Sequence, residues 1–301
     1  MSAPSLSCAV PLPSGFKAGD ILAFHRRDPL MVAERVEESV LQKGLAWHGA
    51  AACLTIGFHS GHADAELAVD GPAPDNDAAE LERMVRRMLG LAQPIELFEQ
   101  AYRTHPELGR LIAGRPGLRV PLTATPFEAL AWAITGQQIS VSAAVSIRRR
   151  LIQAAALRHS GGLCCHPDAG QIARMSEEDL RQAGFSRSKA KTLIALSSRV
   201  EANLLPLDAW ADTLPVDEMR AQLLLVPGIG PWTVSYALLR GFGWLDGSLH
   251  GDVAVRRGLQ MLLDCADKVS EEQTKRWLAE FSPWRALIAA HLWALQSSSI
   301  Y

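Results

Sequence analysis

The sequence predicts a mainly α-helical protein that begins with a smaller α+β domain. Short apolar runs between turn residues are concentrated in the first ninety of the 301 residues. From Pro126 onward, apolar residues recur at helical spacing almost throughout. The segment 71–77, GPAPDND, separates the strand-like runs from the first long helical pattern. These three observations indicate two structurally different parts.

In the N-terminal part, the expected strands lie at 54–58 and 65–69, on either side of a turn rich in Gly, His and Asp. Segment 35–41 is a third candidate, although its charges blur the alternation. After the break, Asp77 is placed to cap a helix that runs to Leu89.

The later part predicts a succession of helices. A helix at 127–135 is interrupted at Gly136, and a second begins after Ser140, which can cap it. A capping-box pattern at Ser176 opens another helix. Further helices are expected at 188–202, 216–226, 232–241, 253–263, 271–280 and 284–296.

Composition places the chain among ordinary globular proteins, with 48% hydrophobic and 21% charged residues. No signal-peptide pattern or membrane-length apolar run is evident, so we expect a cytoplasmic protein. The five cysteines form no C-x-x-C pair, which excludes a four-cysteine zinc or iron–sulfur site and suits a reducing compartment.

Charge is unevenly distributed although the net charge is only −2. Residues 1–100 contain 8 Lys/Arg and 14 Asp/Glu, whereas the remaining residues contain 22 and 18. Any surface that binds phosphates is therefore expected in the later part.

The most informative stretch is 223–233, LLLVPGIGPWT. An apolar helix stops, a tight turn follows with Gly228 and Gly230, and a new helix starts with Pro231 at a position where its missing N–H costs nothing. Free amides at such a helix start suit a phosphate oxygen, which positions a protein on a nucleic-acid backbone without reading sequence. A short αα-hairpin without ligand is the alternative.

At this point the sequence resembles the helix-hairpin-helix DNA glycosylase superfamily, in particular its 3-methyladenine DNA glycosylase II branch. The resemblance rests on the hairpin, on the turn at 136–140, on Gly251-Asp252, and on the segments 283–285 and 291–293. It implies an N-terminal domain (1–90), a connecting segment (91–125) that packs with the C-terminal lobe, a helical lobe with the hairpin (126–243) and a C-terminal lobe (244–301). The catalytic cleft is expected between the two helical lobes.

The resemblance implies that Asp252 is the catalytic carboxylate, since it lies 22 residues beyond Gly230. A carboxylate beside C1′ can stabilise the positive charge that develops when an N-glycosidic bond breaks. Asp is also a favoured N-cap, and both roles can hold together. Relatives that also cleave the DNA backbone place a lysine where this chain has Trp232, so base removal without lyase activity is implied.

A base that reacts must leave the duplex and enter a pocket. Trp232, Tyr236 and Trp293 match the aromatic pocket positions of the resembled branch, and electron-rich rings attract the positive charge of an alkylated purine. Core packing is the alternative role. Trp132, Trp244 and Trp284 are weaker pocket candidates.

The resemblance also implies DNA contacts. The residue that fills the gap left by the base is expected in the turn Gln137-Gln138-Ile139, with Gln138 and Ile139 as candidates. Backbone contacts are expected from Gly228, Gly230 and Thr233 of the hairpin. Basic residues, namely Arg187, Lys189, Lys191, Arg256 and Arg257, are candidates for phosphates or are ordinary solvated charges.

No cofactor is expected to be required. The family hairpin implies a structural Na⁺ or K⁺ held by the backbone carbonyls of Leu224, Val226 and Ile229. His59, His62 and Asp64 have a spacing seen in metal sites, but they fall in an expected hairpin turn, and we predict no metal there.

Taken together, these features predict a monomeric enzyme of bacterial type, associated with the nucleoid, that hydrolyses alkylated purines such as 3-methyladenine and 7-methylguanine from double-stranded DNA. Two alternatives remain. One is a glycosylase for oxidised or deaminated bases, and the other is a helix-hairpin-helix protein that binds DNA without catalysis.

Overall fold

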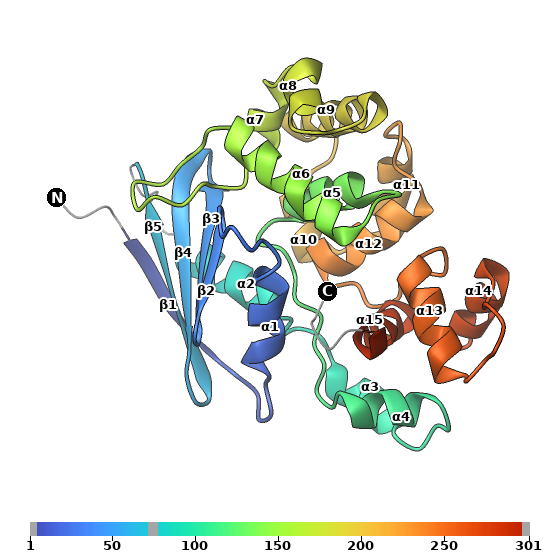
Figure 1. Ribbon diagram of the computed structural model, residues 1–301. Helices are drawn as coiled ribbons and strands as arrows, with labels where there is room; N and C mark the ends of the chain where they lie inside the picture. Colours follow the sequence, from blue (N-terminus) through green and yellow to red (C-terminus); the bar gives the residue numbers. More distant parts are fainter. Residues whose placement is uncertain (1–4, 72–77, 297–301) are drawn as a thin grey trace.

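The computed structural model describes residues 5–71 and 78–296. An antiparallel sheet stands at one side, and the helices of the later chain form the rest of the molecule (Figure 1). The prediction of a mainly helical protein with an N-terminal α+β domain is confirmed. Among the described residues, no helix is both long and apolar enough to cross a membrane.

The sheet has five antiparallel strands in the order β1-β5-β4-β3-β2. The strands are β1 (Ser5–Pro11), β2 (Glu34–Glu37), β3 (Val40–Trp47), β4 (Ala50–Phe58) and β5 (His62–Val69). The predictions at 54–58 and 65–69 fall inside β4 and β5. The single strand predicted at 35–41 is wrong, because the chain reverses within it. Glu38 adopts a positive φ of 47°, and the strand becomes the hairpin β2–β3.

Buried and exposed side chains alternate along the strands, so the sheet has one face toward the core and one face toward solvent. Apolar side chains such as Leu54, Ile56 and Leu67 are fully buried and pack with Leu81 and Val85 of the following helix. Helices α1 (Ala18–His25) and α2 (Ala78–Met88) cover this face, between the sheet and the other helices (Figure 1). Asp77, predicted to cap α2, lies outside the described residues.

The helices of the later part follow the predicted order. They are α3 (Ile95–Tyr102), α4 (Leu108–Gly114), α5 (Pro126–Gly136), α6 (Val141–Ala154), α7 (Ala169–Ala173), α8 (Glu177–Gln182), α9 (Arg187–Glu201), α10 (Leu207–Thr213), α11 (Val216–Leu224), α12 (Pro231–Phe242), α13 (Val253–Leu262), α14 (Glu271–Ala279) and α15 (Arg285–Gln296). Ser140 caps α6 and Ser176 opens α8 with a capping box, as predicted. Sequence reasoning missed the short helices α3, α4, α7 and α10.

Two hydrophobic cores hold the helices together, and α12 contributes to both. Its Val234 and Leu238 pack among α5, α9 and α11, whereas Tyr236 and Leu239 pack among α13 and α15. Helices α3 and α4 join the second of these cores, with Phe98 fully buried in it. Because one helix carries both cores, the residues on α12 have a defined position relative to α13 and α15.

A buried cluster of charges joins the sheet to the helices. The Lys43 Nζ on β3 is fully buried and donates to Glu34 at 2.6 Å and to Glu128 of α5 at 2.7 Å. Arg148 of α6 pairs with the same two carboxylates at 3.1 and 2.8 Å, and His25 lies 2.8 Å from Glu34. Burial would raise the pKa of Glu128, but the nearby cations, foremost Lys43, outweigh it and lower that pKa to about 2. The carboxylate is therefore ionised and paired.

Replacing Glu128 with Gln tests this cluster. The substitution leaves Lys43 and Arg148 buried with one negative charge fewer, and breaking a buried ion pair typically costs about 3–5 kcal/mol. We expect the free energy of unfolding, measured by urea denaturation, to fall by about that amount. Glu272→Gln is the control, since it removes an exposed pair with Arg276 and should cost less than about 1 kcal/mol. Equal losses in the two variants would contradict the role of the cluster.

Candidate active site at the helical hairpin

Helices α11 and α12 form the hairpin, and its two glycines serve different purposes. Gly228 has a φ of +88°, and a Cβ there would lie 2.0 Å from the Thr192 Oγ1 on α9. Gly230 is the extended N-cap residue of α12, and a Cβ there would meet nothing within 4 Å. Of the two glycines, only Gly228 has a positive φ, since Gly230 has a φ of −108°. Gly228 lets the turn pack on α9, while Gly230 leaves the start of α12 open.

The first turn of α12 has no side-chain cap. Its N-cap is Gly230, which has no side chain to accept a hydrogen bond, and Pro231 occupies the first turn. The amides of Trp232 and Thr233 therefore have no capping side chain, and they lie at the positive end of the helix dipole. This geometry suits an anionic oxygen.

Asp252 lies where the second hydrophobic core meets the start of α13. Its Oδ1 accepts hydrogen bonds from the amides of Ala254 at 2.8 Å and Val255 at 3.1 Å, so the residue is the N-cap of α13. The same Oδ1 lies 3.2 Å from the Trp293 Nε1 of α15. Its Oδ2 accepts from the Trp232 Nε1 at 3.1 Å. Asp252 therefore caps α13, as predicted, and the same carboxylate accepts hydrogen bonds from two indole rings.

The two carboxylate oxygens are not used equally. Oδ1 accepts three hydrogen bonds, whereas Oδ2 accepts one, from Trp232. A carboxylate can accept about four hydrogen bonds, two at each oxygen, so Oδ2 keeps capacity for another partner. Since Asp252 is half-buried rather than enclosed, water or a ligand can reach it.

The aromatic residues predicted for a pocket lie together around this carboxylate. Ring centroids are 5.4 Å apart for Trp232 and Tyr236 and 6.1 Å apart for Tyr236 and Trp293. Tyr236 and Trp293 are buried, and Trp232 is half-buried. Trp132 and Trp284 pack against the same core, Trp284 on Phe98, whereas Trp244 packs against the other helical core.

Sequence reasoning missed three residues beside these rings. Arg27 follows α1 in the N-terminal domain, and its Cζ lies 4.0 Å from the Phe24 ring centroid and 5.3 Å from that of Trp132. Burial lowers the pKa of Arg27 to about 10, while Tyr236 opposes this by hydrogen bonding, so the guanidinium keeps its charge at neutral pH. Arg240 lies over Phe24 and Trp293 at 4.8 and 5.5 Å.

Only one of these three carries a sequence signal. Arg240 follows Tyr236 by four residues and so continues the face of Trp232 and Tyr236 along α12. Phe24 and Arg27 come from a different domain, and no motif marks them. A cavity between the domains includes Arg27, Tyr236 and Arg240 in its lining, together with Phe24 and Trp132.

The turn after α5 is tied to the hairpin. The Gln137 Nε2 donates to the Gly228 carbonyl at 3.0 Å and to the Thr233 Oγ1 at 2.9 Å. Gln138 has a φ of +57°, and both Gln138 and Ile139 are exposed. The two candidates for filling a gap in a base stack are thus presented outward, beside the start of α12.

Two side chains predicted to contact DNA are engaged inside the protein. The Thr233 side chain is buried and accepts from Gln137. The Lys189 Nζ donates to the carbonyls of Thr135 at 2.8 Å and Gln137 at 2.7 Å, at the end of α5. Burial lowers the pKa of Lys189. Both side chains therefore bond to polar groups at the end of α5 or in the turn that follows it, and their contacts with DNA stay a prediction.

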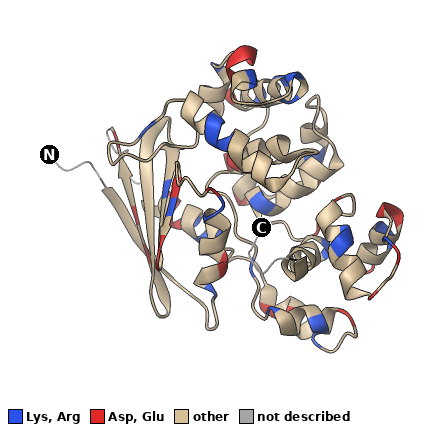
Figure 2. Cartoon of the chain, in the orientation of Figure 1, with Lys and Arg blue, Asp and Glu red and all other residues tan. Residues whose placement is uncertain are grey.

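The other basic candidates lie on α9 and α13 (Figure 2). Arg187 is exposed and pairs with Glu177 at 3.2 Å. Lys191 and Arg257 are exposed, and the Arg256 Nε is buried without a hydrogen-bond partner among the described residues. Acidic residues gather at the first turns of α8 and α14.

Known families match nearly the whole chain. Residues 131–283 match the family described as HhH-GPD superfamily base excision DNA repair protein, and residues 10–125 match the AlkA N-terminal domain. The first match includes the hairpin and Asp252, and the second includes Phe24 and Arg27.

Proteins with similar sequences are named as DNA repair enzymes. The chain is 30% identical over 213 residues to the probable bifunctional transcriptional activator/DNA repair enzyme AlkA of Mycobacterium tuberculosis, covering 69% of this chain and 41% of that protein. It is 30% identical over 188 residues to DNA-3-methyladenine glycosylase 2 of Escherichia coli, covering 62% and 63%. The chain thus spans less than two thirds of either relative.

The fold is also similar to a solved structure. The 3-methyladenine DNA glycosylase from Archaeoglobus fulgidus superposes with a TM-score of 0.78 at 22% identity, covering 95% of this chain and 97% of that chain. The N-terminal sheet and the helices therefore share one arrangement in the two proteins.

The two hairpin glycines provide a matched pair of substitutions. Gly228→Ala forces a side chain into positive φ and against Thr192, so we expect it to lower the free energy of unfolding by more than about 1 kcal/mol. Gly230→Ala has room and an extended backbone, and should change stability by less than about 0.5 kcal/mol. Urea denaturation of both variants checks this, and the reverse order of stabilities would refute the assignment.

Proposed function

The chain belongs to the HhH-GPD superfamily of base excision DNA repair proteins, and from this premise we propose that it is a DNA glycosylase that releases alkylated purines by hydrolysis. One observation carries the proposal. The Asp252 carboxylate is held by the indole N–H groups of Trp232 and Trp293, beside the helix start that suits a phosphate. A merely structural cap would not need two indole donors from two other helices.

The chemistry follows from this geometry. The bond between C1′ and the base nitrogen breaks, its electron pair leaves with the base, and positive charge develops on the sugar. The Asp252 Oδ2, which has hydrogen-bonding capacity left, stabilises that charge and orients the water that adds to C1′. An alkylated purine is already cationic, so it leaves without a dedicated general acid.

The DNA strand and the everted base are bound by different groups of residues. The amides at the start of α12 hold a backbone phosphate, and the turn at 137–139 fills the place of the everted base. The rings of Trp232, Tyr236 and Trp293 receive the base, and each ring attracts a cationic purine by roughly 0.5–2 kcal/mol. The partner is double-stranded DNA, bound by a monomer at the nucleoid.

The absence of lyase activity is part of the proposal. A lyase needs an amine that attacks C1′, and Trp232 occupies the position where lyase relatives place that lysine. Lys189, on the neighbouring helix α9, donates to carbonyls at the end of α5.

A monovalent cation fits the hairpin chemically. Leu224 ends α11, and Val226 and Ile229 lie in the turn, where the carbonyl of Val226 accepts from the amide of Ile229 at 3.0 Å. Carbonyls at the end of a helix carry the negative end of its dipole, and they are oxygen ligands of the kind that bind K⁺. A bound Na⁺ or K⁺ would stabilise this turn. No step of the reaction depends on it.

The relatives support the substrate class, and the alternatives remain testable. The relatives from E. coli and A. fulgidus are named as 3-methyladenine glycosylases. Enzymes for 8-oxoguanine share the fold, with a TM-score of 0.64 for the Clostridium acetobutylicum glycosylase/lyase. Release of oxidised bases in place of alkylated ones would favour that alternative, and binding without release would favour a non-catalytic protein.

Asp252→Asn tests the carboxylate. Asn is as good an N-cap as Asp, so α13 keeps its cap and duplex binding should persist. We expect free 3-methyladenine release from methylated DNA to fall by at least about a hundredfold, since the charge that stabilises the transition state is lost. Asp264→Asn is the control, because Asp264 is exposed with a φ of 51° that Asn also tolerates. Equal release by the two variants would refute the proposal.

Trp232→Phe separates the indole N–H from the aromatic ring. The variant keeps a flat ring but removes the hydrogen bond to the Asp252 Oδ2. A hydrogen bond to a charged group contributes about 1.5–3 kcal/mol, so single-turnover excision should slow by roughly tenfold to a hundredfold. Trp244→Phe, in the other core, should leave the rate unchanged. Loss of duplex binding in proportion to the rate would contradict a role in positioning Asp252.

A further inference from the structure

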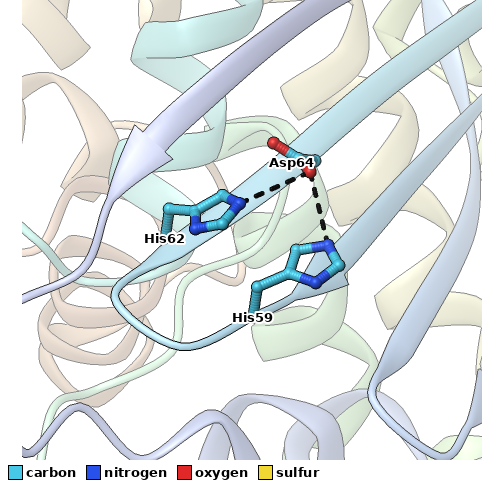
Figure 3. Close-up of side chains that lie close together, drawn as sticks. All are labelled: His59, His62 and Asp64. Atoms are coloured by element: carbon cyan, nitrogen blue, oxygen red, sulfur yellow. Dashed lines mark ion pairs between the residues drawn. The ribbon is translucent and has the colours of Figure 1, made fainter.

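The turn between β4 and β5 brings three potential metal ligands together (Figure 3). His59 follows the last residue of β4, His62 begins β5, and Asp64 lies two residues further. The Nε2 atoms of His59 and His62 lie 3.3 and 3.6 Å from the Asp64 Oδ2. One ligand atom from each residue lies within 4.8 Å of the other two. None of the three residues belongs to the site around Asp252.

The register of the hairpin explains this arrangement. Phe58 pairs with Ala63, and both are buried on the core face. The amide of His59 donates to the carbonyl of His62 at 2.9 Å, so the two histidines face each other across the turn. Since side chains alternate along a strand, Asp64 lies on the same face as His62, away from the core. The spacing in the sequence groups these three residues, and the register shows that they share one face of the hairpin.

A glycine leaves room for this cluster. Gly57 pairs with Asp64 across the two strands, and a Cβ at Gly57 would lie 3.4 Å from the His59 Nε2. The His59 ring therefore leans over the backbone of Gly57 toward the carboxylate. The rings of His59 and His62 stack with centroids 4.9 Å apart and an interplanar angle of 20°. Both rings are thus held side by side before any ion arrives.

The donor set defines the kind of ion. Two imidazole nitrogens and one carboxylate oxygen suit first-row divalent ions such as Zn²⁺, whereas Mg²⁺ and Ca²⁺ prefer oxygen ligands alone. The side chains of His59, His62 and Asp64 are 52%, 47% and 59% exposed, so water can complete the coordination. Small rotations of the side chains suffice to place the two Nε2 atoms and the Asp64 Oδ2 about 2.0–2.2 Å from one zinc ion, the distances that zinc requires.

We propose that His59, His62 and Asp64 form a surface binding site for a zinc-class divalent cation on the N-terminal domain. This site reverses the expectation from sequence that no metal binds there. The bound ion bridges β4 and β5 at their turn. The turn also holds the end of β1, because the Leu12 amide donates to the carbonyl of Gly61 at 2.9 Å. Since the ligands converge only in the folded sheet, the ion stabilises the fold.

The test measures zinc binding by the full chain. Protein without an affinity tag is stripped with a chelator, and Zn²⁺ is titrated by isothermal calorimetry. The variant His62→Gln removes one ligand, and its exposed position keeps the fold intact, as circular dichroism will check. The matched control is His48→Gln. His48 is 51% exposed and lies 3.2 Å from Glu80, but this pair has only one imidazole.

The wild type and His48→Gln should bind one Zn²⁺ with the same affinity, and His62→Gln should bind it at least about tenfold more weakly. Zn²⁺ should raise the thermal midpoint of the first two proteins, and Mg²⁺ should raise that of neither. Any zinc held by the exposed Cys265 is common to all three proteins and cancels in the comparison. Equal affinity in all three, or no binding by the wild type, would overturn the proposal.

Discussion

The candidate active site depends on a single carboxylate that three segments of the chain share. Asp252 caps α13 through two backbone amides and holds an indole from α12 and an indole from α15. These helices belong to one hydrophobic core, so the position of the carboxylate is set by packing rather than by a flexible loop. Its Oδ1 is saturated, and Oδ2 is left for the proposed chemistry. Such fixed orientation is what electrostatic stabilisation of a developing charge requires.

A second constraint positions the N-terminal domain. The charges around Lys43 bind β2 and β3 of the sheet to α5 and α6 of the helical part. This contact brings Arg27 against Trp132 and next to Tyr236. The sheet domain therefore contributes to the surroundings of the aromatic rings, although it is remote from Asp252 in the sequence. Arg27 thus adds a second guanidinium, beside Arg240, to the region around the aromatic rings.

The parts of the structure that sequence could predict are those with local signals. The hairpin, the N-cap at Asp252 and the spacing of Trp232 and Tyr236 are all readable within one or two helical turns. The positions of Phe24 and Arg27 beside the aromatic rings could not be predicted from the sequence, because they arise from the packing of one domain on another. Thr233 was expected to contact DNA as part of the hairpin and Lys189 because of its charge, and neither pattern could show that their polar atoms bond to Gln137 and to the end of α5. The hairpin β2–β3 was missed because Glu38 takes a backbone conformation that its residue type rarely adopts.

The hydrogen bonds of Gln137 have a consequence for how the protein would engage a duplex. This side chain donates to Gly228 and Thr233 and so fastens the exposed tip at Gln138 and Ile139 to the helical hairpin. These hydrogen bonds link the tip to the hairpin. A base step would be opened at a set distance from the gripped strand, with no separate loop to order at that moment. In the proposed function, the tip and the hairpin would thus be carried along the groove together as successive base pairs are inspected.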